Sequence, residues 1–145
     1  LYHNDVLVSL MTFGSLRKNL GQKSKEGSFE LLRFCNKLNT TVIGGASKLF
    51  KYFTRNYYYD SIISYADRSW STGNLYEQLG FKYVHKTKPN FYHVKGINRY
   101  NRFTYRKDIL VKDGYDPKLT AREIMLNRGF YRIYDSGSIK FIFQN

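Results

Sequence analysis

The chain of 145 residues contains a single cysteine, Cys35, and only two prolines. One cysteine excludes an internal disulfide and leaves no cysteine pair for a zinc site, so a reducing, intracellular setting is expected. The three histidines, His3, His85 and His93, are too scattered to predict a metal site. No apolar run approaches the roughly 20 residues that a membrane helix requires, and no signal or lipidation segment is visible. We therefore expect neither a metal centre nor a membrane partner.

Acidic residues are also scarce. Lys and Arg number 24 against 11 Asp and Glu, which gives a formal net charge of +13 and a pI near 9.8. This charge exceeds the magnitude of about 2–8 that suits a small soluble domain, so it favours a polyanionic partner, nucleic acid above all. The alternative is a basic surface that only maintains solubility. No His-Asn-His cluster, GIY-YIG pattern or paired-acid nuclease motif is present.

Aromatic residues make up 18% of the chain and hydrophobic residues 42%, enough for one packed domain. Periodicity and turn residues predict an α+β fold with a mostly antiparallel central sheet flanked by helices. The expected strands are 1–3, 6–13, 29–35, 61–66, 81–84, 91–94, 100–107, 131–134 and 139–143. The expected helices are 45–55 and 119–127, and residues 71–78 are expected to form a loop and a short helix. The last helix, together with a final hairpin of 131–134 and 139–143, extends the C-terminal part.

Two motifs separated by thirty residues carry a family resemblance. The first is Thr41-Val42-Ile43-Gly44-Gly45-Ala46, where a glycine pair opens a helix. The second is Leu75-Tyr76-Glu77-Gln78-Leu79-Gly80-Phe81. With the intervening strand they resemble the core of the GNAT acyltransferase family over residues 29–84. The resemblance implies a GNAT-like fold for the whole chain, 1–145, as a fragment that lacks the family's first strand and opening helices.

In the GNAT family the glycine loop binds the pyrophosphate of acetyl-CoA through backbone amides. The resemblance assigns this role to Gly44, Gly45 and Ala46, with Asn74 as a further cofactor-binding position. Thr41 stands where the family carries Gln or Arg, so one side-chain contact is lost. Tyr76 would protonate the departing thiolate. The nearest candidates for the general base are Glu30 and Asp67, of which Glu30 lies on an expected strand. An acetyl-CoA-dependent N-acetyltransferase is therefore one expected function, and a retained scaffold without this activity is the other.

A second resemblance covers more of the chain. The segments 10–14, 31–38, 63–68 and 131–137 look like a domain of phage-encoded, Hef-like homing endonuclease proteins, where it accompanies a separate nuclease module. This resemblance implies a DNA partner, an upstream nuclease domain and a location in the cytoplasm of an infected bacterium. It favours a DNA-binding GNAT-like domain as the function, without bound cofactor and without the nuclease site.

Nine basic residues lie between 82 and 112, and Asp108 is the only acid among them. If 100–107 is a strand, Arg102 and Arg106 share one face, and an Arg/Tyr face can grip phosphates and stack on bases. The alternative is a solvated sheet face. A second basic segment, 17–25, is either a phosphate-contacting flap or an irregular excursion. The predicted nucleic-acid contacts are Arg17, Lys18, Lys82, Lys95, Arg99, Arg102, Arg106 and Lys107. A structural interaction module remains a third possibility.

Overall fold

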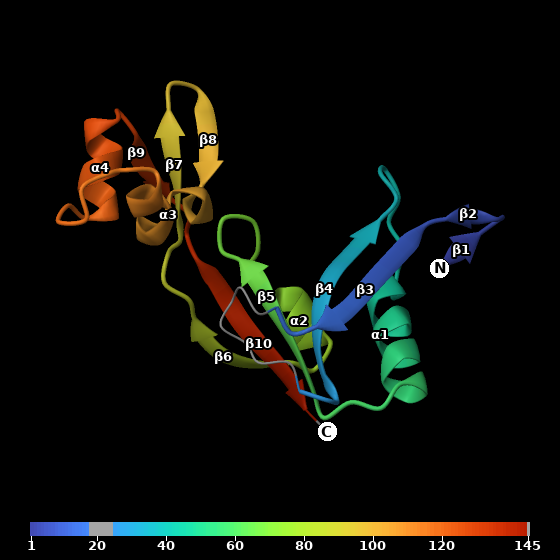
Figure 1. Cartoon of the computed structure of the whole chain (residues 1–145). Coiled ribbons are helices and arrows are strands. Elements are labelled where there is room, and N and C mark those ends of the chain that lie inside the picture. The colour runs from blue at the N-terminus through green and yellow to red at the C-terminus, as the bar shows by residue number, and fades with distance from the viewer. Residues whose placement is uncertain (18–24, 145) are drawn as a thin grey trace. The chain divides into compact units, whose positions relative to one another are not determined.

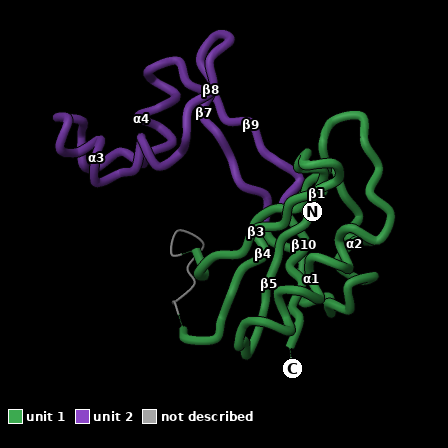
Figure 2. Tube along the Cα trace, turned by 90° about the vertical axis from the view of Figure 1, so that its right-hand side faces the viewer, with its two compact units in different colours: residues 1–87, 138–145 green, residues 88–137 purple. Residues whose placement is uncertain are grey.

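The computed structural model describes residues 1–17 and 25–144. Within them the protein is α+β, with a mixed five-stranded sheet, two smaller antiparallel sheets and four α-helices (Figure 1). The chain divides into two compact units (Figure 2). Unit 1 consists of residues 1–87 and 138–145, and unit 2 consists of residues 88–137. No described helix is long and apolar enough to cross a membrane.

The five-stranded sheet of unit 1 has the order β3-β4-β5-β10-β6, and β4 with β5 is its one parallel pair. The largely antiparallel arrangement that the sequence predicts is therefore confirmed, and β5 is the middle strand of the five. A small hairpin, β1–β2, precedes this sheet and turns at Asn4 and Asp5, both with positive φ. The strands of unit 1 are β1 (Tyr2–His3), β2 (Val6–Leu7), β3 (Ser9–Ser15), β4 (Ser28–Asn36), β5 (Ser61–Asp67), β6 (Lys82–Lys86) and β10 (Ser138–Gln144).

Two helices connect the strands of unit 1. Helix α1 (Gly45–Asn56) links the parallel strands β4 and β5, and its apolar stripe buries Phe50 and Phe53. These rings pack with Ile62 and Phe141 in the main hydrophobic core. The short helix α2 (Asn74–Gln78) follows β5. Apolar spacing predicts α1, and the loop and short helix predicted over 71–78 are confirmed, with α2 forming the second part of that segment.

Unit 2 has a three-stranded antiparallel sheet and two helices. Its strand order is β8-β7-β9. Helix α4 begins with a capping box, in which Thr120 and Glu123 exchange side-chain to backbone hydrogen bonds, and Gly129 beyond its end has φ +77°. The predicted C-terminal helix is thus confirmed. The elements of unit 2 are β7 (Phe91–Lys95), β8 (Asn98–Asn101), a 3₁₀ helix (Arg102–Tyr105), α3 (Lys107–Lys112), α4 (Ala121–Asn127) and β9 (Tyr131–Tyr134).

The predicted strand 100–107 is wrong. Strand β8 ends at Asn101, whose side-chain oxygen accepts a hydrogen bond from the Phe103 amide at 3.0 Å. This local bond offers the backbone an alternative to the sheet ladder, and it begins the 3₁₀ helix, which α3 follows. Arg102 and Arg106 therefore do not alternate along one strand face.

The predicted hairpin of 131–134 with 139–143 is also wrong. Strand β9 pairs with β7 in unit 2, whereas β10 pairs with β5 and β6 in unit 1. Asp135 explains the break, because its carboxylate accepts hydrogen bonds from the amides of Asn90 at 2.7 Å and Gly137 at 2.8 Å. The turn residues 135–138 join the two units instead of closing a hairpin.

Replacing Gly73 with alanine should destabilise unit 1. Gly73 has φ +92°, and a Cβ there would lie 2.3 Å from the Phe141 ring. We expect left-handed strain of about 1–2 kcal/mol and a further ~1–3 kcal/mol from overpacking against a buried ring. Urea unfolding followed by circular dichroism measures the loss.

Gly80→Ala is the matched control. Gly80 has a similar φ of +87°, but its nearest neighbour, Phe143, would lie 3.4 Å from the new Cβ. In the control, the free energy of unfolding should therefore fall only by the contribution of the left-handed backbone strain. Equal losses in free energy for the two variants would contradict the close approach of Phe141 to Gly73.

Candidate nucleic-acid interface

One face of the unit 2 sheet, which we call the open face, presents aromatic, aliphatic and cationic side chains. It consists of two rows of directly opposed residues: Tyr92, Asn101 and Ile133 in one row, and Val94, Arg99 and Tyr131 in the other. Tyr131 is 67% exposed and Ile133 47%. The Arg99 guanidinium lies over the Tyr92 ring, 4.5 Å from its centroid. A sheet face on which exposed side chains surround a guanidinium held on an aromatic ring can contact phosphates and bases.

The opposite face of this sheet packs against the helices. Leu110, Ile124, Met125 and Phe130 form a buried core there. His93 belongs to this packed face and is 2% exposed. The packing fixes the plane of the sheet, so the open face is held on a rigid support.

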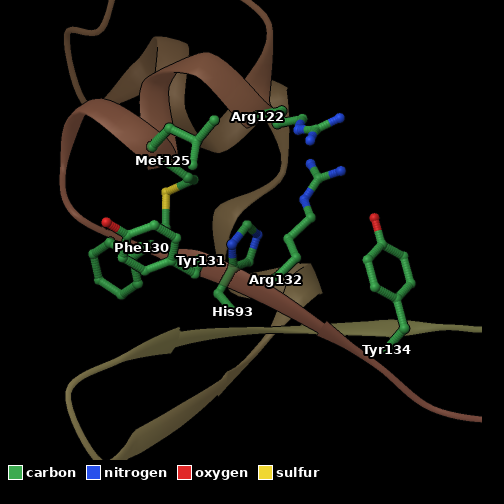
Figure 3. A pocket seen from close by; sticks show the side chains of 8 residues that line it. His93, Arg122, Met125, Phe130, Tyr131, Arg132 and Tyr134 are labelled. Carbon is green, nitrogen blue, oxygen red and sulfur yellow. The ribbon is translucent and has the colours of Figure 1, made fainter.

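A pocket of about 210 Å³ lies between α4 and the packed side of the sheet. Arg122 comes from α4, Arg132 and Tyr134 come from β9, and His93 comes from β7 (Figure 3). In Figure 3 the two guanidinium groups lie next to one another, and the Tyr134 hydroxyl is on the same side. Neither arginine forms an ion pair within the described residues.

Burial shapes the chemistry of His93. Its Nδ1 atom is buried and has no hydrogen-bond partner among the described residues. Burial, followed by the positive charge of Arg132, lowers the pKa of His93 from its ordinary value of 6.5, because both disfavour the imidazolium. His93 is therefore a neutral ring at pH 7, with one nitrogen available to a ligand.

The structure places the predicted cations of unit 2 in different surroundings. Arg99 lies on the open face. Lys95 donates to the Arg128 carbonyl at 2.9 Å. Arg106 is exposed and forms an ion pair with Asp108 at 2.7 Å.

Arg102 and Lys107 are partly buried. The Arg102 guanidinium lies 4.8 Å from the centroid of the Phe103 ring, and Lys107 donates to the Asp116 carbonyl at 3.3 Å. Of the five cations predicted in this unit, Arg99 alone thus lies on the open face.

The remaining predicted cations fall outside unit 2. Lys82 is exposed on β6 of unit 1. Arg17 also belongs to unit 1, where its guanidinium binds both carboxylate oxygens of Glu30. Lys18 lies outside the described residues, as does most of the basic segment 17–25.

Sequence reasoning missed the cations nearest the pocket, Arg122 and Arg132. Arg132 was assigned to a hairpin with β10, so its neighbours were wrong. The alternation of Arg132 and Tyr134 with Tyr131 and Ile133 was visible in the sequence. Without the partner strand β7, however, this alternation does not tell which face is packed.

The start of α1 carries the predicted cofactor loop. Gly44 has φ +68°, and no heavy atom of the described residues, its own and its chain neighbours' aside, lies within 4 Å of the position that a Cβ would take there. Gly45 is closely packed instead, since its Cβ would lie 3.0 Å from Val42. A pocket of about 470 Å³ borders the loop and is lined by Thr41, Ile43 and Lys48, among others. Ala46 lies in the first turn of α1, where amides have no helical acceptor and favour an anion.

The predicted catalytic side chains are engaged in packing or pairing. Tyr76 is partly buried and stacks on Phe141, with ring centroids 5.2 Å apart. Glu30 is 1% exposed and is held by Arg17 through its Nε at 3.0 Å as well as Nη2. Asn74 is exposed at the first position of α2. The Glu30 carboxylate is thus already paired with a cation, Arg17.

Comparison with protein-family models and with curated proteins finds no match to this chain. Among the described residues, no three side chains of the metal-binding types come together as a metal site.

The pH dependence of stability tests the buried, neutral state of His93. Because the folded pKa lies below the unfolded value, the unfolded chain takes up the proton first as the pH falls below about 6.5. The free energy of unfolding of unit 2 should then decrease, by at most about 1.4 kcal/mol per pH unit, until the folded pKa is reached. Above pH 7 the effect should vanish.

His93→Gln should flatten this decrease, whereas His85→Gln, at an exposed position of β6, should retain the wild-type slope. Urea unfolding at pH 7.5, 6.5 and 5.5, followed through NMR signals of β7, provides the comparison. A wild-type slope that His93→Gln leaves unchanged would contradict the buried, neutral imidazole.

Proposed function

We propose that this protein binds DNA through the open face of unit 2. The observation that carries the proposal is the row of the partly buried Tyr92 with the exposed Asn101 and Ile133, beside the exposed Arg99. Antiparallel sheets can enter a groove of DNA with such a face, and the flanking cations then contact phosphates. An aromatic ring that carries a stacked guanidinium suits both kinds of contact.

Charge supports the same function. Residues 88–137 contain eleven Lys and Arg against five Asp and Glu. Cations on a small unit attract a polyanion from a distance, and released counterions then favour the complex. Phosphate binding of this kind needs no sequence-specific contact, so the proposal concerns affinity for DNA and not a particular site.

We further propose that unit 1 is a GNAT-type scaffold. The order β4-α1-β5-α2-β6 agrees with the strand and helix order that the resemblance implies. The parallel pairing of β4 with β5 around α1 and the left-handed Gly44 at the helix start support it. The association with a phage homing endonuclease, an upstream nuclease domain and the cytoplasm of an infected bacterium belongs to the same proposal.

Salt dependence and two substitutions test DNA binding by the full chain. Affinity for a DNA duplex should fall steeply between 50 and 200 mM salt, as for proteins that neutralise several phosphates. Arg99→Gln should weaken binding about tenfold and reduce the salt slope by about one. Ile133→Glu should weaken it further, because it places a carboxylate on the open face beside Tyr92. Fluorescence anisotropy measures all three.

Val111→Glu is the matched control. Val111 is 37% exposed on α3 of the same unit, so the variant changes the net charge equally at a different place. It should bind DNA nearly as well as the wild type. If both glutamate variants lose the same affinity, the open face is not the contact surface, and if the wild type binds no DNA, the proposal fails.

Binding of acetyl-CoA is the second candidate function, and the pocket beside α1 favours it. Gly44 leaves the backbone open to a phosphate, and Lys48 lines the same pocket. These groups fit the phosphate portion of the cofactor, which would supply an activated acyl group when bound. The pairing of Glu30 with Arg17 disfavours proton removal by that carboxylate, so the structure supports binding better than acyl transfer.

Calorimetry with acetyl-CoA tests this candidate. Lys48→Glu should weaken binding about tenfold, because it removes a charge-assisted contact and adds repulsion. Lys51→Glu, one turn away on α1 and outside this pocket, should bind like the wild type. A wild-type protein that binds no acetyl-CoA would exclude the candidate and leave unit 1 as a scaffold.

A further inference from the structure

The pocket between α4 and the sheet of unit 2 has a cationic lining without a matching acid. Arg122 and Arg132 both border it, and their guanidinium groups lie next to one another in Figure 3. Two like charges at one small pocket repel each other unless an anion lies between them. The pocket thus has an electrostatic reason to hold a negative group.

Four of the five acids of unit 2 are engaged elsewhere. Asp108 pairs with Arg106, and Glu123 caps α4 through Thr120. Asp135 accepts hydrogen bonds from the amides of Asn90 and Gly137. Asp116 accepts one from the Lys118 amide. No described carboxylate forms an ion pair with Arg122 or Arg132.

Buried polar atoms at the same pocket lack partners. His93 is 2% exposed, and its Nδ1 atom has no hydrogen-bond partner among the described residues. The buried Nε atom of Arg132 has none among them either. Unsatisfied buried groups are rare and costly. The Arg132 guanidinium is also fixed in place, 4.1 Å from the centroid of the Phe91 ring. The site is therefore preorganised for an acceptor.

We propose that this pocket binds a single phosphate group. Guanidinium groups donate in a planar fork that matches phosphate oxygens. The Tyr134 hydroxyl is a further donor, and the neutral His93 ring donates from Nδ1 in the tautomer that carries its proton there. A volume of about 210 Å³ lies below the roughly 300–1,000 Å³ of sites for drug-sized ligands, so it suits one phosphate and not a whole nucleotide.

The phosphate has two possible sources, a nucleic-acid strand or a free small phosphate. The shared chemistry is a tetrahedral oxyanion with at least one charge, held by two arginines. The site lies against the packed face of the sheet, so it does not depend on DNA binding by the open face. Failure of one proposal leaves the other intact.

The experiment titrates the full chain with inorganic phosphate at constant ionic strength, and follows backbone amide shifts by NMR. Saturable shifts should appear at α4 and β9. Arg122→Gln and Arg132→Gln should each raise the dissociation constant for phosphate about tenfold, because each removes a charge-assisted hydrogen bond. Arg122 is exposed, so its variant should keep the fold even if Arg132→Gln does not. Lys112→Gln, an equal charge change at an exposed position of α3, should bind phosphate like the wild type.

Competition then identifies the source. Displacement of phosphate by an oligonucleotide with a 5′-phosphate, but not by its 5′-hydroxyl form, assigns the site to a strand end. Displacement by both forms assigns it to the backbone, and displacement by neither assigns it to a free phosphate. Each of these results supports the pocket. Shifts that do not saturate, or equal affinity in Arg122→Gln, Lys112→Gln and the wild type, would overturn it.

Discussion

The insertion of β10 between β5 and β6 is the constraint on which the rest of the structure depends. Phe141 of β10 is 1% exposed, and its ring occupies the space that a side chain at Gly73 would need. The same ring stacks on Tyr76. A strand from the end of the chain is therefore required in the middle of the unit 1 core. Consequently, unit 2 is inserted in the chain between β6 and β10, which are neighbouring antiparallel strands of unit 1.

Unit 2 compensates for its small size with cation–aromatic contacts. Its buried hydrophobic cluster comprises four residues, which is little for fifty residues of chain. Arg128 lies over three rings, those of Tyr105, Tyr115 and Phe130, at 5.0–5.4 Å from their centroids. Such contacts contribute about 0.5–2 kcal/mol each when partly desolvated. Arginine thus has a structural role here as well as a proposed binding role, and the basic composition of the unit does not by itself measure its affinity for DNA.

The sequence predicted local elements better than their partners. The stripe of Phe50 and Phe53 indicated α1, and Thr120 or Asp116 near the start and Gly129 past the end indicated α4, because these signals are local to one helix. The end of β8 was missed, because one hydrogen bond from Asn101 decides it. The partner of β9 was missed for a different reason. Sequence proximity favours a hairpin with β10, and only the long-range pairing with β7 shows that Arg132 and His93 lie on one face.

The pairing of Arg17 with Glu30 bears on both proposed functions. Glu30 is buried on β4, so an unpaired carboxylate there would be costly, and the arginine that neutralises it is one of the predicted DNA contacts. A DNA phosphate would therefore compete with a buried, bidentate partner for Arg17, and a proton-abstracting Glu30 would need to lose the same partner. Both events leave a buried charge uncompensated. This interaction consequently favours a structural role for both side chains, and it shifts the search for DNA contacts to Arg99 on the open face of unit 2.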